Sequence, residues 1–351
     1  MPQGSVLGPL LFLLYINDIS NIKEDCKIIL FADDTNIFVI GETITEAYAK
    51  ANKILRTISK YMECNLLHIN TKKCCHMYFA PTKTKTNKTT SPCLDNYQLS
   101  ISSKNIKLVK ETKFLGVIID EKLSWKIHLT NLNKKLKSAC GRLYRIKSCL
   151  PDHLHKEIYH SLFESHLTFA ISVWGGVSNN LLDPVFRTQK KCMRIMFGNT
   201  DGYLDKFRTC VRARPVGQQK LGIEFYRREP SKPLFKKYDL LTVHNLYRHR
   251  CIMELFKISK YKIPDPMFSL LKLSPRNQDR LITPHPSHNF TYKAPWLWNN
   301  FRKEAASKKL CCFSDDDSFV KSVLKKSLLC AQNDNSHEPW CNDNFTKFNS
   351  N

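Results

Sequence analysis

Long apolar segments, internal repeats and zinc-type cysteine spacing are all missing from this 351-residue sequence. The longest apolar run, residues 6–16, is too short to span a bilayer and contains Gly8-Pro9. No basic segment precedes this run, so we expect neither a transmembrane helix nor a signal peptide. The 14 cysteines include adjacent pairs such as Cys74-Cys75, which do not have the spacing of a zinc ribbon or knuckle. We therefore expect no membrane partner, no zinc site, and a location in the nucleus or the cytoplasm.

Acidic residues are also scarce. The chain has 31 Asp and Glu against 55 Lys and Arg, which gives a formal net charge of +24. Folding does not require such an excess, so it favours a polyanionic partner. Nucleic acid is the first candidate. An anionic membrane surface is the alternative, but the sequence contains no spanning segment, so we do not favour it.

Two of the few acids stand side by side between two strand-like segments. The segments before and after Asp33-Asp34, residues 27–31 and 35–40, are rich in β-branched and aromatic residues, which predicts a hairpin with the aspartates at its tip. Neighbouring carboxylates repel each other unless a cation neutralises them. Paired hard oxygen ligands suit Mg²⁺ and can support two-metal phosphoryl transfer. The alternative is a simple Asp-rich turn, because Asp is common in turns.

Hydrophobic spacing indicates an α+β first third followed by a mostly helical remainder. Apolar residues 9–18 predict a short helix buried on every side, and Thr43-x-x-Glu46 is a capping box ahead of an amphipathic helix. The expected strands cover residues 75–80, 98–101, 106–109 and 114–119. The expected later helices begin near Trp125 and cover residues 155–169, 184–197 and 240–257, and the last twenty residues are expected to be frayed.

The helix after Trp125 combines an apolar stripe with a cationic surface. The stripe is Leu129, Leu132, Leu136, Ala139, Leu143 and Ile146. The other faces carry Lys126, Lys134, Lys135, Lys137, Arg142, Arg145 and Lys147. An ordinary solvated face is one interpretation. Because the charges on these positions have one sign, their repulsion is unrelieved without an anion, and we favour a helix that faces nucleic acid.

Five motifs in order resemble those of non-LTR (LINE-type, jockey-like) retrotransposon reverse transcriptases. They are residues 2–19 with Pro2-Gln3-Gly4, then Phe31-Ala32-Asp33-Asp34, residues 67–74, residues 113–128, and the helical segments with Val173-Trp174-Gly175 and Gln189-Lys190-Lys191. The resemblance continues to Leu297-Trp298-Asn299 and so covers nearly the whole chain. It implies an RNA-directed DNA polymerase that uses Mg²⁺ at a two-metal site and binds an RNA template and a DNA primer.

The resemblance also implies roles for individual residues. Asp33 and Asp34 correspond to catalytic metal ligands, and Lys73 to the lysine that protonates the leaving pyrophosphate. Gln3 and Gly4 resemble the turn that approaches template and nucleotide. A simple glycine turn is the alternative interpretation of these two residues. Phe114, Leu115 and Gly116 look like the primer grip, or a plain strand with a bulge glycine. Lys134, Lys135, Arg142 and Arg145 are the expected contacts to the nucleic-acid backbone.

The same resemblance predicts three regions and a missing part. Residues 1–120 are expected to form a partial palm, residues 121–200 a thumb-like helical region, and residues 201–351 a basic, mostly helical C-terminal region. The family's third carboxylate, its fingers and its endonuclease precede the Pro2-Gln3-Gly4 segment. We therefore expect a truncated, inactive reverse transcriptase. The alternatives are a non-catalytic nucleic-acid-binding remnant and a relic that is not translated.

Overall fold

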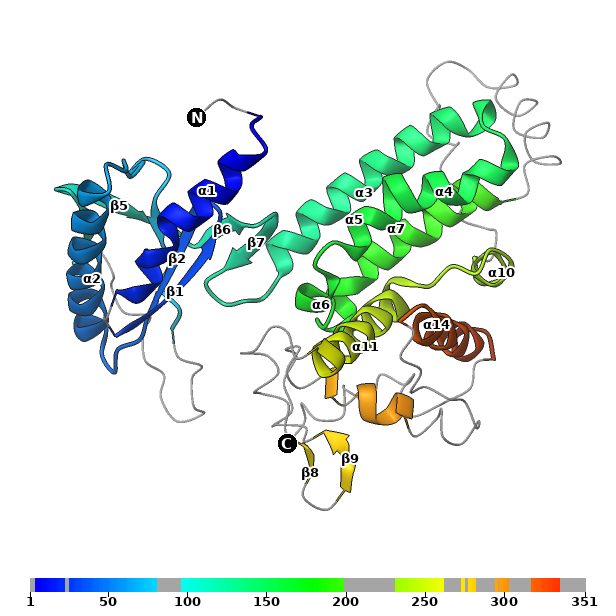
Figure 1. Ribbon diagram of the computed structural model, residues 1–351. Helices are drawn as coiled ribbons and strands as arrows, with labels where there is room; N and C mark the ends of the chain where they lie inside the picture. The colour runs from blue at the N-terminus through cyan, green and yellow to red at the C-terminus, as the bar shows by residue number, and fades with distance from the viewer. Residues whose placement is uncertain are drawn as a thin grey trace. The chain divides into compact units, whose positions relative to one another are not determined.

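The computed structural model of the chain (Figure 1) divides it into two compact units, Met1–Leu123 and Ser124–Asn351. The structure describes residues 4–22, 25–80, 96–198, 231–261, 273–274, 277–281, 294–295, 297–302 and 317–334. Each unit has its own buried hydrophobic residues.

Unit 1 is built from short strands and two long helices. Its elements are α1 (Leu7–Ile16), a 3₁₀ turn (Asn17–Asn21), β1 (Cys26–Phe31), β2 (Asp34–Val39), α2 (Ile44–Cys64), β3 (Cys75–His76), β4 (Leu99–Ile101), β5 (Lys104–Leu108), β6 (Glu111–Phe114) and β7 (Val117–Asp120). β1-β2 and β6-β7 are antiparallel hairpins. In the order β3-β5-β4, β3 runs parallel to β5 and β4 antiparallel to it. The first third is thus α+β, as the sequence predicts.

The predicted capping box starts α2. The side chain of Thr43 accepts a hydrogen bond from the backbone N–H of Glu46 (3.2 Å), and Glu46 Oε2 accepts one from the N–H of Glu42 (2.9 Å). The first bond satisfies a donor that a helix start leaves without a partner, and the second ties the first turn of the helix to the residue before its N-cap. The capping prediction is confirmed.

Helix α2 packs against two of the three sheets of unit 1. Ile54 and Ile58 are buried in a cluster with side chains of β1 and β2, whereas Tyr48 and Leu55 are buried in a second cluster with side chains of β4 and β5. The predicted amphipathic helix is confirmed, and its buried stripe holds the β1-β2 hairpin from one side.

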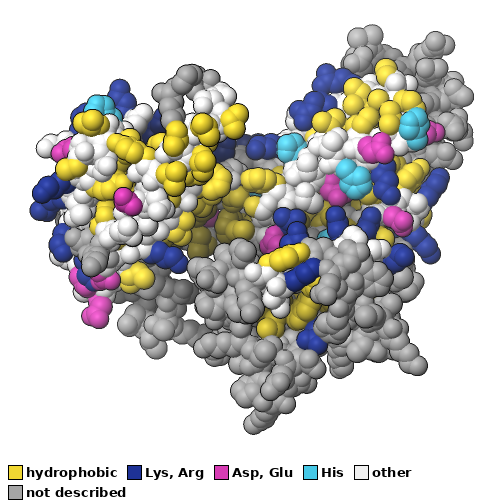
Figure 2. Space-filling view, viewed as in Figure 1, with side chains coloured by type: hydrophobic (Ala, Val, Ile, Leu, Met, Phe, Trp, Pro, Cys, Tyr) yellow, Lys and Arg dark blue, Asp and Glu magenta, His cyan; other side chains and the backbone are white. Residues whose placement is uncertain are grey.

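The expectation that α1 is buried on every side is wrong. Only Ile16 of this helix is buried, while Leu7, Leu10 and Leu14 are more than half exposed. Figure 2 shows hydrophobic side chains gathered over α1. Hydrophobicity all round predicts burial only where neighbouring elements surround a helix. Here Phe12, Ile16 and the following Ile19 join the cluster under β1 and β2, and the other faces stay open.

Two strand predictions need correction. The strand expected over residues 75–80 is limited to β3, because its partner β5 ends at Leu108, opposite His76. The strand expected over residues 114–119 is interrupted by a tight turn between β6 and β7. Leu115 and Gly116 both have positive φ, 43° and 87°. Leucine rarely adopts a positive φ, so Leu115 gives the sequence little indication that a turn lies here.

Unit 2 is mostly helical. Its elements are α3 (Lys126–Ile146), α4 (His155–Tyr159), a π-helical turn (His160–Glu164), α5 (Ser165–Thr168), α6 (Ile171–Trp174), α7 (Asn179–Phe197), α10 (Lys232–Lys237), α11 (Val243–Tyr261), β8 (Leu273–Ser274), β9 (Asn277–Leu281) and α14 (Asp317–Asp334). The long helix predicted after Trp125 is confirmed. The helix predicted from Pro184 begins five residues earlier, at Asn179, and contains the proline. The expected frayed tail lies outside the described residues.

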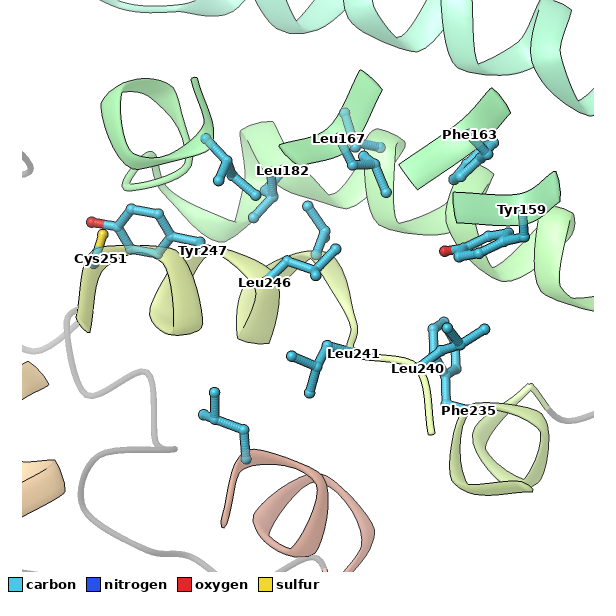
Figure 3. Packing of buried hydrophobic residues seen from close by; sticks show 14 of the residues in the cluster. Tyr159, Phe163, Leu167, Leu182, Phe235, Leu240, Leu241, Leu246, Tyr247 and Cys251 are labelled. Carbon is cyan, nitrogen blue, oxygen red and sulfur yellow. The ribbon is translucent and has the colours of Figure 1, made fainter. Parts of the chain in front are cut away.

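The core of unit 2 joins segments that are far apart in the sequence. Figure 3 shows Tyr159, Phe163 and Leu167 facing Leu240 and Leu246 across the packed interior. A buried amide fixes this arrangement. Gln189 Nε2 donates to the carbonyl oxygen of Leu241 (3.0 Å) and to Tyr159 Oη (3.1 Å), and its Oε1 accepts from the N–H of Val243 (2.8 Å). Satisfied buried polar groups of this kind select one packing arrangement.

Gly175 lets α6 and α11 pack closely. A Cβ atom added there would lie 2.6 Å from both the carbonyl oxygen of Ile171 and Cδ2 of Tyr247. Its φ is an ordinary −70°, so the requirement for glycine is steric and not conformational. The structure therefore gives the Val173-Trp174-Gly175 motif a packing role.

Candidate functional site

The two aspartates lie at the tip of the β1-β2 hairpin. Phe31 pairs with Asp34, so the connecting turn consists of Ala32 and Asp33 alone. Ala32 has φ of +51°, and a positive φ at the first central residue is typical of hairpin turns that match the strand twist. Both carboxylates are exposed. Asp33 belongs to the turn, while Asp34 is already the first residue of β2.

The hairpin that carries the aspartates has one packed face and one open face. Ile28, Leu30, Ile37 and Val39 face the cluster formed with α2. The alternate side chains point away from it, and Phe31 remains 60% exposed. The packed face holds the strand ends in place, so the two carboxylates are presented at a fixed position next to an open apolar surface.

The donor chemistry of the pair suits a hard divalent cation. Carboxylate oxygens are the ligands that Mg²⁺ prefers, and Mg²⁺ usually takes its remaining ligands from water and substrate phosphates. In the part of the chain that the structure describes, no group of three or more His, Cys, Asp and Glu side chains is placed to hold a metal ion. Asp33 and Asp34 thus offer two ligands, and further ligands have to come from outside this pair.

The other predicted site residues near the start of the chain and before β3 are Gln3, Gly4 and Lys73. Gln3 falls outside the described residues, and Gly4 is exposed with φ of +89°, a conformation that suits glycine. Lys73 is exposed in a turn that its backbone N–H closes on the carbonyl oxygen of Asn70 (3.0 Å). Among the described residues, no hydrogen bond or ion pair links Lys73 or Gly4 to the aspartates.

The predicted primer-grip residues form the β6-β7 turn. Phe114 pairs with Val117, which leaves Leu115 and Gly116 as a two-residue connection with positive φ at both positions. This is the geometry of a type I′ hairpin turn. Leu115 is 38% exposed. The bulge interpretation is wrong for Gly116, because the residue turns the chain and does not interrupt a single strand.

The cationic surface of α3 agrees with the sequence pattern. The predicted stripe from Leu129 to Leu143 is buried, and Lys134, Lys135, Arg142 and Arg145 are all exposed. Helix α3 contains no Asp or Glu. At 1.5 Å per residue, Lys134 and Arg145 lie about 16 Å apart along the axis, a length over which one strand of a duplex presents roughly five phosphates.

Among the described residues, the hydrogen bonds of the α3 arginines go to neutral groups of their own helix. Arg142 Nη1 donates to Ser138 Oγ (3.4 Å) and Arg145 Nε to the carbonyl oxygen of Gly141 (3.3 Å). Within the described residues, neither arginine forms an ion pair. Burial, together with the nearby charge of Lys135, lowers the pKa of His128 on the packed face, so this histidine adds no charge at neutral pH. The surface is therefore ready to accept an anion.

Sequence reasoning missed the polar contact that fixes α3 on α7. The Thr188 hydroxyl has two acceptors within hydrogen-bond distance for its single proton, Asn133 Oδ1 (2.6 Å) and the carbonyl oxygen of Pro184 (3.0 Å). Asn133 lies beside the apolar stripe of α3. Its spacing in the sequence indicates a half-buried position but does not indicate a partner on another helix. The contact adds a directional bond to the apolar packing that holds α3 against α7.

Residues 1–119 match the family model described as reverse transcriptase (RNA-dependent DNA polymerase). The RNA-directed DNA polymerase from mobile element jockey of Drosophila melanogaster is 26% identical over 208 residues, which cover 56% of this chain and 22% of the relative. The jockey protein of Drosophila funebris is 25% identical over 210 residues, with the same coverage. The probable RNA-directed DNA polymerase from transposon X-element of Drosophila melanogaster is 24% identical over 207 residues, again 56% and 22% of the two chains.

The match spans about a fifth of the length of these relatives. No solved structure matches the chain significantly. Among the described helices, none combines the length and the apolar character needed to cross a bilayer. The resemblance inferred from the motifs is confirmed over about 56% of the chain: residues 1–119 match the reverse transcriptase family model, and the chain is similar to the RNA-directed DNA polymerases of jockey-type non-LTR retrotransposons.

Proposed function

We propose that this chain is the C-terminal part of the polymerase palm of a non-LTR retrotransposon, followed by a thumb-like helical region and a basic trailing region. In this proposal the palm part covers residues 1–120, the thumb-like region residues 121–200 and the trailing region residues 201–351. The work of the whole enzyme is DNA synthesis on an RNA template from a DNA primer, in the nucleus or the cytoplasm. The family match over residues 1–119 supports this assignment.

The observation that carries the proposal is the position of the two carboxylates. A two-residue turn presents Asp33 and Asp34 together, both exposed, at the end of a hairpin packed on α2. We assign Asp33 as a metal ligand and Asp34 as its weaker neighbour, with Mg²⁺ supplying the charge that phosphoryl transfer requires.

The remaining site residues act on substrates in this scheme. Lys73 supplies a proton to the leaving pyrophosphate, Gln3 and Gly4 approach template and nucleotide, and Phe114, Leu115 and Gly116 hold the primer. The exposure of Lys73 and the open space around Gly4 are compatible with these roles. Lys134, Lys135, Arg142 and Arg145 bind the nucleic-acid backbone.

A polypeptide of residues 1–351 alone is inactive in this proposal. By family resemblance, the third carboxylate of the metal site comes from a motif upstream of the Pro2-Gln3-Gly4 segment. Two aspartates without it hold the metal ions poorly, and a two-metal site that loses a ligand loses most of its rate.

A second candidate function is nucleic-acid binding without catalysis. The acid-free surface of α3 favours it, because phosphate binding by these cations does not depend on Asp33. The two candidates differ at the hairpin, where only the polymerase needs a cation.

Mn²⁺ provides a direct test of the hairpin, since it replaces Mg²⁺ and broadens the NMR signals of nearby nuclei. In a titration of the 351-residue chain, we expect the backbone amide signals of Ala32, Asp33 and Asp34 to broaden at the lowest Mn²⁺ concentrations. The double variant Asp33→Asn with Asp34→Asn should remove this effect, because it removes both charges.

The matched control, Asp152→Asn with Asp183→Asn, removes one exposed and one half-buried carboxylate elsewhere in the chain and should leave the broadening at the hairpin unchanged. If signals elsewhere broaden first and those of the hairpin do not respond to its own variant, Asp33 and Asp34 are turn residues without a metal role.

A further inference from the structure

Gly141 is exposed in the middle of α3, where a glycine is unexpected. A helix of 21 residues is less stable with glycine than with alanine at an interior position, because glycine has more backbone freedom to lose on folding. Glycine is usually retained in such a place for a positive φ or for close packing. Gly141 has a helical φ, and among the described residues nothing lies within 4 Å of a Cβ atom added there.

The surroundings of Gly175 differ from those of Gly141. There, an added Cβ would contact Ile171 and Tyr247 at 2.6 Å, so the fold itself accounts for the glycine. At Gly141, no contact with the described residues requires a glycine. The space above Gly141 is therefore open to a molecule that approaches α3 from outside.

The side chains around Gly141 indicate what that partner is. Residues three and four positions away on a helix are its surface neighbours, and here they are Lys137, Ser138, Tyr144 and Arg145, all exposed. Two cations, a hydroxyl group and an aromatic ring are groups that contact phosphates and sugars in nucleic-acid complexes. No acid is present on the helix to repel a phosphate.

We propose that Gly141 is the point at which the phosphodiester backbone of a bound duplex lies directly against α3. This inference rests on the proposed nucleic-acid-binding function of the helix and adds a position to it. Without a side chain at residue 141, the duplex backbone can approach the helix closely enough for the short Ser138 hydroxyl to reach a phosphate oxygen. Arg145, which now donates to the carbonyl oxygen of Gly141, would exchange that partner for the phosphate.

Two substitutions test this contact in the full chain. Gly141→Ala should raise the melting temperature by roughly 2–4 °C, because alanine favours the helix, and should also weaken binding to a short DNA duplex. The Gly141→Leu variant should also fold, but its leucine side chain should keep the duplex backbone away from the helix. We expect its affinity to fall by about tenfold, as for loss of a charged hydrogen bond, and its slope of log affinity against log salt to become shallower by roughly 0.9.

Fluorescence anisotropy with labelled duplex DNA measures both quantities. Asn180→Leu, which adds the same side chain at an exposed position of α7, is the matched control and should bind as the unmodified chain does. If Gly141→Leu keeps full affinity and the full salt slope while the unmodified chain binds with a steep slope, the close-approach inference is wrong and the binding function stands. If the unmodified chain itself does not bind, the proposed function is wrong, and the inference falls with it.

Discussion

A polypeptide of residues 1–351 is expected to extend no DNA primer on an RNA template, whether Mg²⁺ or Mn²⁺ is supplied. The reason lies in the ligand count at the hairpin tip. Asp33 and Asp34 supply two carboxylates, and the described residues place no third metal ligand with them. A two-metal site orients the attacking and leaving oxygens only when both ions are held, so the expected loss of rate is several orders of magnitude.

Gel-based primer extension with a labelled primer measures this directly. The assay should include Asp33→Ala and, as a control, Asp152→Ala in unit 2, where the carboxylate is also fully exposed. We expect none of the three chains to extend the primer. Robust extension by the unmodified chain that Asp33→Ala abolishes and Asp152→Ala preserves would contradict the proposed inactivity of this polypeptide.

Reversing three charges on α3 is expected to remove most of the affinity for nucleic acid. In the triple variant Lys134→Glu, Lys135→Glu and Arg142→Glu, phosphates meet repulsion where they now meet attraction. If three phosphate contacts are lost, the slope of log affinity against log salt on duplex DNA falls by roughly 2.7. Affinity itself should drop by about 10³-fold or more at low salt, with little dependence on base sequence.

The control reverses the same number of charges on a different surface. Lys53, Arg56 and Lys60 are exposed on α2 of unit 1, and their triple change to Glu alters the net charge of the chain equally. Titrations between roughly 50 and 200 mM salt separate the two variants. A similar loss in both would mean that net charge alone drives binding, and an affinity of the unmodified chain that salt does not change would rule out phosphate contacts.

Local sequence patterns predicted the elements that depend on local physics. The stripe from Leu129 to Leu143, the capping contact of Thr43 with Glu46 and the two strands around the aspartates all reflect spacing or residue preferences within one element. For the same reason the Asp33-Asp34 pair could be placed at a hairpin tip. The match of residues 1–119 to the reverse transcriptase family confirms the resemblance that the motifs indicated.

Features that depend on tertiary packing could not be predicted in this way. The exposure of α1 depends on how many neighbours surround the helix, and its composition is the same in either case. Leu115 adopts a left-handed conformation against its own preference because Phe114 and Val117 pair across it. The contact of Thr188 with Asn133 joins residues 55 positions apart, and no local pattern encodes it.

In the proposed function, Asp33 acts on the transferring phosphate while the cations of α3 supply affinity. Primer extension separates these two roles in a chimaera in which the upstream palm and fingers of a jockey-type relative precede residue 1, with and without Asp33→Asn. We expect metal-dependent extension by the chimaera. We expect Asp33→Asn to abolish turnover and leave duplex affinity nearly unchanged, because the substitution alters one ligand and no phosphate contact. If the Asp33→Asn chimaera retained most of the rate, Asp33 would be a turn residue, and the metal assignment on which the proposed function rests would be wrong.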